Sequence, residues 1–288
     1  MQTLSDREVG LMFWADRDSL DEIKSMGVRC GQLGIGGATD LGHHFVDDWK
    51  NALAEDQFTL ISVIAAYNGE SYADIPTVER TVGFIPRATR EERFRRTLDI
   101  SDFAAALGVR SIGCHVGFVP EDTSNIDYIA VREVVRQICG HTAKHGQTFA
   151  LETGQEPADV LLRFLKDVAR PNLGINFDPA NMILYGTGDP IEALDVLGAN
   201  VISVHAKDGN WPPKDKPGAL GSEQPLGKGA VGIERFVRKL KEIGFKGPLN
   251  IEREAENQED RLKDLREAVP YLRRIVNATA NQQLRTNN

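Results

Sequence analysis

The sequence has little cysteine, no long apolar run and no excess of positive charge. Its three cysteines, Cys30, Cys114 and Cys139, lack metal-site spacing, and an odd number cannot pair completely within one chain. We therefore expect buried free thiols and a reducing compartment. No apolar stretch approaches the roughly 20 residues that cross a bilayer, and the first ten residues lack the apolar segment of a signal peptide. These absences predict a cytoplasmic protein without a membrane partner.

Positive charge is outnumbered, because 34 Lys and Arg residues stand against 42 Asp and Glu residues, a formal net charge of −8. Phosphate binding needs a concentrated positive surface, so this balance argues against a nucleic-acid partner. It is compatible with a neutral polar substrate and a cation. No GxGxxG follows the first apolar run, so the fingerprint of a dinucleotide site is also missing.

What the sequence contains is a series of short apolar runs that alternate with amphipathic segments. The runs are VGLMFW (9–14), VRCGQLGI (28–35), FTLISVIAAY (58–67), SIGCHVGF (111–118), TFALETG (148–154), LGINFDPA (173–180), VISVHAKD (201–208) and GPLNIERE (247–254). Runs that are apolar on both faces are typical of parallel strands covered by helices. Strict alternation predicts an α/β fold, a single (β/α)8 TIM barrel spanning residues 1–288. An open doubly wound sheet is the alternative.

Connections and helix ends follow from local chemistry. Helix N-caps are predicted at Ser19, Thr89 and Asp189. Residues 68–88 are expected to form a polar loop, and the last helix to occupy 258–276. The Pro/Gly-rich loop 209–229 is long for a strand-to-helix connection. We expect it on the active-site face as a lid, or alternatively as a contact in a homo-oligomer.

Ionisable side chains fall near the ends of the last four apolar runs, where barrel enzymes hold their chemistry. The candidates are Glu152, Asp178, His205 and Glu252. Three carboxylates and one imidazole buried at the same height would repel one another without a cation, so we predict a divalent metal site. Three oxygen donors and one nitrogen donor favour Mn2+ or Mg2+, with Co2+ or Zn2+ as alternatives. Glu254 points to the same side as Glu252, but it lies farther from the apolar part of the run and is expected at the rim.

Two further charged side chains at this end are candidates for substrate contacts. His115 could hydrogen-bond a substrate hydroxyl, or it could be a satisfied core histidine. Lys207 could neutralise a substrate oxyanion or phosphate, or it could pair with Asp208 or Glu254.

Aromatic and amide side chains complete the expected pocket. Trp14 and Trp211 could form apolar walls for a substrate ring, although Trp14 could equally be ordinary core. Gln32 is a weaker candidate. The remaining histidines fall on or near helices and are interpreted as surface residues: His43, His44, His141 and His145.

At these residues the sequence resembles a known family, the xylose-isomerase-like TIM-barrel superfamily and in particular its sugar phosphate isomerase/epimerase group. The segments that carry the resemblance are HVGF (115–118), ALETG (150–154), NFDPANM (176–182), SVHAKD (203–208), PLGKG (225–229) and NIERE (250–254). The resemblance covers nearly the whole chain. It implies one divalent ion, commonly manganese, and the ligands implied are Glu152, Asp178, His205 and Glu252.

The ketose 3-epimerases of that group also use their two ligand glutamates for acid–base work on opposite faces of the substrate. The resemblance therefore implies Glu152 and Glu252 as the catalytic pair. Asn181 stands where those epimerases usually have a histidine, and Trp211 where they usually have an arginine. Both family residues help to hold substrate oxygens, so Asn181 and Trp211 are the substrate-binding candidates here. The departures also raise an oxidised or glycosylated sugar as the substrate.

Together these features predict an enzyme of carbohydrate metabolism. We expect a divalent-metal-dependent sugar isomerase or epimerase that moves protons on a keto-sugar through a metal-bound enediolate. An alternative is a lyase or hydrolase acting on a 3-keto-glycoside with the same metal site. More remote alternatives are a non-catalytic sugar- or metal-binding protein and an abasic-site endonuclease.

Overall fold

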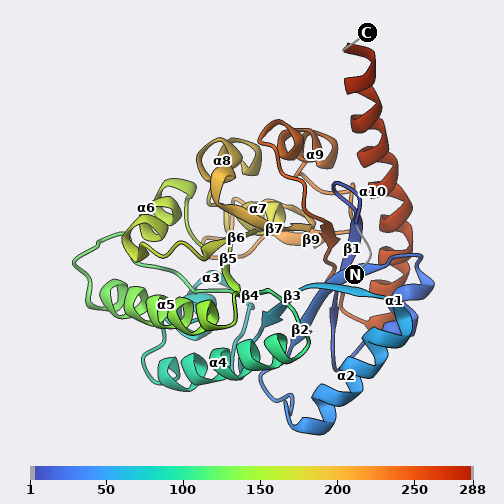
Figure 1. Cartoon of the computed structure of the whole chain (residues 1–288). Helices are drawn as coiled ribbons and strands as arrows, with labels where there is room; N and C mark the ends of the chain where they lie inside the picture. Colours follow the sequence, from blue (N-terminus) through green and yellow to red (C-terminus); the bar gives the residue numbers. More distant parts are fainter. Residues whose placement is uncertain (1–3, 287–288) are drawn as a thin grey trace.

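A closed barrel of parallel strands forms the centre of the molecule (Figure 1). The computed structural model describes residues 4–286, and within them the barrel order is β1-β10-β7-β6-β5-β4-β3-β2. The barrel strands are β1 (Val9–Trp14), β2 (Cys30–Ile35), β3 (Thr59–Ala65), β4 (Ser111–Cys114), β5 (Thr148–Glu152), β6 (Leu173–Phe177), β7 (Val201–Ala206) and β10 (Leu249–Ile251). Because β1 pairs with both β2 and β10, the sheet closes, which confirms the barrel and excludes the open sheet.

Helices surround the strands (Figure 1), and buried apolar residues of both form one hydrophobic core. They are α1 (Leu20–Ser25), α2 (His43–Asp56), α3 (Ile75–Thr81), α4 (Arg90–Ala106), α5 (Ile126–Lys144), α6 (Ala158–Val168), α7 (Pro179–Tyr185), α8 (Pro190–Leu197), α9 (Ile233–Glu242) and α10 (Gln258–Thr286), with a 3-10 turn at η1 (Gly198–Asn200). Aromatic pairs bridge the two layers; Phe177 of β6 and Phe236 of α9, for example, stack with ring centroids 5.9 Å apart. The three cysteines are free and buried, as expected.

All three residues predicted as N-caps occupy N-cap positions, and two of them cap with their side chains. The side chain of Ser19 accepts a hydrogen bond from the Glu22 backbone N–H, and Asp189 accepts from that of Ile191. Thr89 occupies the N-cap position of α4, but its side chain makes no capping hydrogen bond within that helix. Helix α10 also continues to Thr286 instead of ending at 276. None of the helices in residues 4–286 combines the length and apolarity needed to span a membrane.

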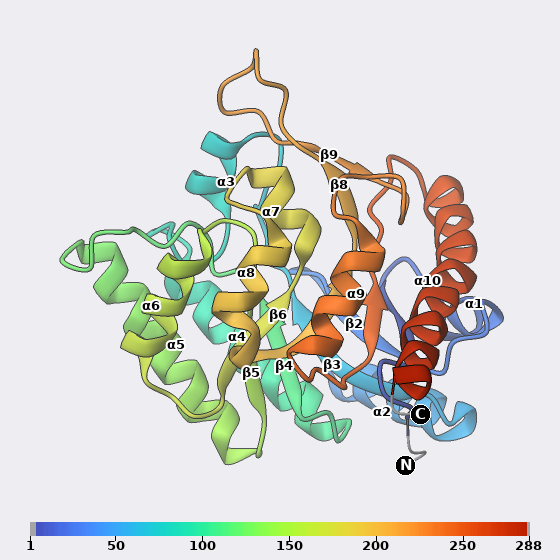
Figure 2. The same cartoon turned by 90° about the horizontal axis from the view of Figure 1, so that it is seen from above.

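Extra elements gather at the end of the barrel where the strands finish (Figure 2). Two were predicted as loops: 68–88 contains α3, and 209–229 contributes to an antiparallel hairpin of β8 (Asp208–Asn210) and β9 (Ser222–Gln224). The third, α7, begins directly after Asp178, within a run expected to be only a strand and its end. Together they build walls above the strand ends, where the polar residues lie.

Candidate metal centre and active site

The four predicted ligands meet at the strand ends. Glu152 ends β5, Asp178 is the N-cap of α7, His205 lies in β7 and Glu252 follows β10. One ligand atom from each lies within 4.8 Å of the others. The Nδ1 atom of His205 is 3.2 Å from Oε1 of Glu152, 3.1 Å from Oε2 of Glu252 and 3.7 Å from Oδ2 of Asp178. Glu252, rather than Glu254, joins the cluster.

Asp178 shows that this cluster fits a cation. Its Oδ1 atom accepts hydrogen bonds from the backbone N–H groups of Ala180 and Asn181, at 2.8 and 3.0 Å. Its Oδ2 atom is buried and has no hydrogen-bond partner among residues 4–286. A buried carboxylate oxygen without a partner is costly. Because this oxygen faces the other three ligand atoms, a divalent ion bound by three oxygens and one nitrogen would satisfy it.

Charge on the neighbouring cations balances the carboxylates. Burial acts to raise the pKa of Glu252, but the charges of Lys207 and His205 outweigh it and bring that pKa well below its ordinary value. Burial acts to lower the pKa of His205, but Glu252 and Glu152 raise it well above its usual range. Since imidazole binds metals only in its neutral form, a divalent ion would take the place of the His205 proton.

Lys207 joins the cluster to the hairpin above it. Its Nζ atom lies 3.0 Å from Oε2 of Glu252 and 3.4 Å from Oε2 of Glu223 in β9. Glu223 also accepts hydrogen bonds from Arg253 at 2.9 Å and from the Glu254 backbone N–H at 2.7 Å. The predicted partners of Lys207, Asp208 and Glu254, are therefore wrong. Glu223 was not foreseen, because only the folding of the hairpin brings it here.

Asp208 instead shapes the chain that follows the hairpin. Its Oδ1 atom accepts hydrogen bonds from the backbone N–H groups of Gly209 and Val231, and its Oδ2 atom accepts from those of Gly227 and Gly229. A Cβ atom at Gly229 would lie 2.2 Å from Oδ1 of Asp208. This close approach explains Gly229 of the PLGKG segment, whereas Gly227 has φ +88° and would place a Cβ atom 2.5 Å from the ring of Tyr271.

A cavity of about 480 Å³ opens directly above the cluster. Both Glu152 and Glu252 line it, together with His115, Asn181 and Lys207. Oε1 of Glu152 accepts a hydrogen bond from Nδ2 of Asn181 at 3.1 Å and lies 3.5 Å from Nε2 of His115. These side chains therefore position the carboxylate that faces the cavity.

The cavity walls include Trp14, which the sequence predicted, and two tyrosines that it did not single out, Tyr72 and Tyr185. Trp14 lines the cavity and donates from Nε1 to Oε1 of Glu254 at 2.7 Å. Glu254 is also paired with Arg17 at 2.9 Å, which places it at the rim. Tyr72, from the predicted loop 68–88, packs beside His115 with ring centroids 5.6 Å apart.

Two residues that were predicted to line the pocket, Trp211 and Gln32, lie outside the cavity lining. Trp211 is absent from the cavity lining and is 46% exposed. Gln32 lies below the cavity, where Nε2 donates to Ser62 at 2.8 Å and to Asn176 at 3.3 Å. Asn176 in turn donates to Oε2 of Glu152 at 3.3 Å, so Gln32 belongs to the polar layer that supports the cluster.

The fold and the cluster define a class of protein: a parallel eight-stranded barrel with an acidic, metal-fitting site at its strand ends. The chain belongs to the xylose isomerase-like TIM barrel family, whose model matches residues 20–275. This membership confirms the family resemblance drawn from the sequence.

Solved structures carry the same fold. A xylose isomerase domain protein from Planctomyces limnophilus is 40% identical, with a TM-score of 0.91 over 96% of this chain and 99% of that chain. A D-tagatose 3-epimerase-like protein is 20% identical, with a TM-score of 0.72 over 94% and 100%. A xylose isomerase-like TIM barrel protein from Mycobacterium smegmatis, solved in complex with magnesium, is 16% identical, with a TM-score of 0.66 over 94% and 97%.

Proposed function

We propose that this protein is a divalent-metal-dependent isomerase or epimerase that moves a proton on a keto-sugar. The observation that carries the proposal is the placement of Glu152 and Glu252. Both line the cavity, yet Glu152 ends β5 and Glu252 follows β10, and these strands are separated in the barrel by β6 and β7. Two carboxylates that approach one space from different sides suit the removal and return of a proton.

Glu152 is prepared to act as a base. Burial acts to raise its pKa, but the charges of His115 and His205 outweigh burial and bring the pKa below its ordinary value. Its carboxylate is therefore ionised at neutral pH and can accept a proton. Asn181 and His115 fix its orientation toward the cavity, which is the placement that general base catalysis requires.

Glu152, Asp178, His205 and Glu252 would hold the ion, and Mn2+ is the ion we propose, with Mg2+, Co2+ or Zn2+ as substitutes. The bound ion would supply Lewis acidity that makes the carbon next to a carbonyl more acidic. The three carboxylates of the cluster support a hard divalent ion at this site. The magnesium in the Mycobacterium smegmatis structure supports the same kind of ion.

The fate of the proton decides the product. A proton returned to the same carbon from the side of Glu252 gives an epimer. A proton returned to the adjacent carbon gives an aldose–ketose isomerisation. Loss of an oxygen substituent from the next carbon gives an elimination, as in a lyase acting on a 3-keto-glycoside. One site geometry serves all three reactions, and product analysis separates them.

The charge of the cavity favours a sugar without phosphate. Its acidic lining residues are Glu152, Glu223, Glu252 and Glu254. Its ammonium group, on Lys207, is already bonded to Glu252 and Glu223. An added phosphate would meet a negative field with no uncommitted lysine in this lining, so we propose a neutral keto-sugar as the substrate.

Solvent deuterium tests the proposal. The Mn2+-loaded protein is incubated in D2O with a panel of neutral keto-sugars and 3-keto-glycosides, and mass spectrometry and NMR locate the deuterium. We expect incorporation next to the carbonyl, lost in Glu152→Gln and kept in Glu259→Gln, a control on the exposed face of α10. Sugars that bind without any exchange would indicate a non-catalytic binding protein. Full exchange in Glu152→Gln would remove Glu152 from the mechanism.

A further inference from the structure

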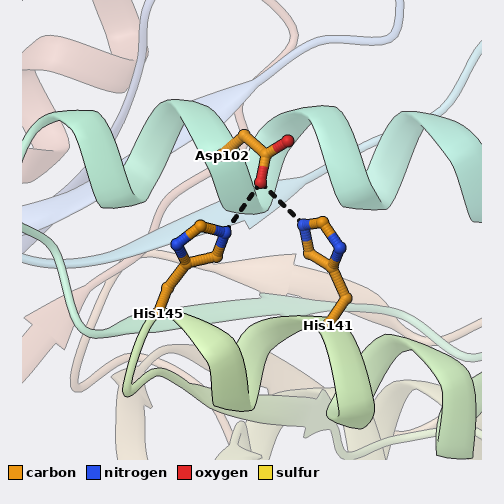
Figure 3. Close-up of side chains that lie close together, drawn as sticks. All are labelled: Asp102, His141 and His145. Carbon is orange, nitrogen blue, oxygen red and sulfur yellow. Dashed lines mark hydrogen bonds and ion pairs between the residues drawn. The ribbon is translucent and has the colours of Figure 1, made fainter.

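A second cluster of potential metal ligands lies outside the barrel, between α4 and α5 (Figure 3). It consists of Asp102 from α4, and of His141 and His145 from the end of α5. Helix α5 leads into the start of β5, so this cluster lies toward the barrel end opposite to the cavity. It shares no residue with the candidate active site.

The geometry converges on one point. The Nε2 atom of His141 lies 2.6 Å from Oδ1 of Asp102, and the Nε2 atom of His145 lies 2.9 Å from the same oxygen. Figure 3 shows both imidazole rings rising from α5 toward the carboxylate on the facing helix. The four-residue spacing places the two histidines on one face of α5. Gly146, with φ +65°, ends the helix there.

We propose that Asp102, His141 and His145 form a zinc site that clips α4 to α5. Two imidazoles and one carboxylate are a borderline-soft donor set, which favours Zn2+ over Mg2+ or Mn2+. Zn–N and Zn–O distances near 2.0 Å separate tetrahedral ligand atoms by about 3.3 Å, so each histidine nitrogen needs to move away from Oδ1 of Asp102 by less than 1 Å. The last carbonyls of α5 also favour a cation at this end of the helix.

Solvent completes the proposed coordination. The side chains of Asp102, His141 and His145 are 56%, 20% and 35% exposed. The cluster is therefore accessible to an ion from solution, and water fills the remaining position. The barrel site offers three oxygens and one nitrogen, whereas this one offers two nitrogens and one oxygen, so the two sites are expected to prefer different metals.

Zinc stoichiometry tests the site, measured by equilibrium dialysis of the full chain followed by elemental analysis. Zn2+ also fits the barrel ligands, so we expect two zinc ions per wild-type chain. The Asp178→Asn variant, which lacks a barrel ligand, is expected to bind one. Adding His141→Gln and His145→Gln to that variant is expected to reduce binding to zero. His43→Gln with His44→Gln, on the exposed start of α2, is the matched control and is expected to leave the count unchanged.

A second experiment measures whether zinc stabilises the contact between α4 and α5. Zn2+ is expected to raise the melting temperature of the Asp178→Asn variant and to leave the variant without His141 and His145 unchanged. Cu2+ used as a probe is expected to show two nitrogen ligands in the electron paramagnetic resonance spectrum of Asp178→Asn. Equal zinc counts with and without the two histidines would overturn the proposal and leave the cluster as a hydrogen-bonded contact between helices. The outcome is independent of the proposed function, because the test uses no sugar.

Discussion

The ammonium group of Lys207 lies 3.0 Å from Oε2 of Glu252, one of the two candidate ligand glutamates that line the cavity. The same oxygen is 3.1 Å from Nδ1 of His205. Oε2 of Glu252 therefore lies between the Lys207 ammonium group and the imidazole of His205. Lys207 therefore contributes part of the positive charge that the buried carboxylates need, and a divalent ion would contribute the rest.

Replacing Lys207 by methionine removes that charge while nearly keeping the side-chain volume. We expect Lys207→Met to lower the free energy of unfolding of the metal-free protein by about 3–5 kcal/mol, the usual cost of leaving a buried charge without its partner. Saturating Mn2+ should recover more stability in this variant than in the wild type, because the ion supplies the missing charge. Urea denaturation with EDTA or with Mn2+ measures both quantities.

The matched control is Lys228→Met. Lys228 is 64% exposed and lies 3.8 Å from Glu267, so its replacement should change the free energy of unfolding by less than about 0.5 kcal/mol. Equal stability of the Lys207→Met and wild-type proteins in EDTA would show that Lys207 does not compensate the carboxylates.

The two carboxylate oxygens of Asp178 have different roles: Oδ1 caps α7, and Oδ2 is the candidate metal ligand. One substitution can remove the second role and keep the first. In Asp178→Asn, the amide oxygen can still cap α7 through Ala180 and Asn181, while the amide nitrogen replaces the unpartnered Oδ2. We expect the fold to persist, since Asn is as good an N-cap as Asp. Mn2+ affinity should fall by at least about 100-fold, because even the outer partners of metal ligands are worth 10–100-fold.

Calorimetry with Mn2+ and thermal unfolding measure the two effects. Asp189→Asn is the control, since Asp189 caps α8 in the same way without belonging to the cluster. Unchanged Mn2+ affinity in Asp178→Asn would exclude Asp178 as a ligand.

The barrel and the position of the cluster were predictable because both depend on local information. An apolar run marks a covered strand, and the place of Glu152 or His205 within its run sets its height in the barrel. Matched heights on neighbouring strands are enough to bring side chains together once the strands are parallel. The same logic preferred Glu252 to Glu254, since one residue lies deeper in its run.

Contacts that cross between elements were not predictable in this way. Glu223 reaches Lys207 only because β8 and β9 fold into a hairpin, and the loop composition carries no signal of that return. Trp211 was placed by analogy of position, yet the hairpin turns its side chain toward solvent. His141 and His145 were interpreted as surface residues, but their shared partner Asp102 depends on how α4 packs against α5.

Asp208 should control the order of the segment that closes one side of the site. In Asp208→Asn an amide NH2 would replace one oxygen that now accepts two backbone N–H groups, leaving both donors unsatisfied. We expect a loss of about 2–3 kcal/mol in the free energy of unfolding. Trypsin should also cleave faster within 209–229. Asp215→Asn, at an exposed position of the same loop, is the control for both measurements. Wild-type stability and cleavage in Asp208→Asn would contradict this role.

Glu156 should make the stability of the protein depend on pH. Its side chain is buried, and burial raises its pKa to about 8, although a hydrogen bond from the Val119 backbone N–H to Oε1 at 2.8 Å lowers it in part. Its Oε2 atom has no hydrogen-bond partner in the part of the chain that the structure describes. Below pH 4.5 the folded and unfolded chains both keep this proton. Between pH 4.5 and 8 the unfolded chain releases it while the folded chain retains it, so the free energy of unfolding falls as pH rises.

Glu156→Gln removes this titration and keeps an acceptor for Val119. At pH 8 we expect the variant to be more stable than the wild type by on the order of 4 kcal/mol, since each unit of pKa shift corresponds to about 1.4 kcal/mol. At pH 4.5 the two proteins should differ little. Urea denaturation at pH 4.5, 6 and 8 measures this difference. The control is Glu121→Gln, because Glu121 is exposed and lines a surface cavity together with Glu156. A stability difference that stays constant across these pH values would mean that Glu156 does not hold a proton in the folded protein. A difference that grows with pH, absent in Glu121→Gln, would assign the proton to this buried carboxyl group.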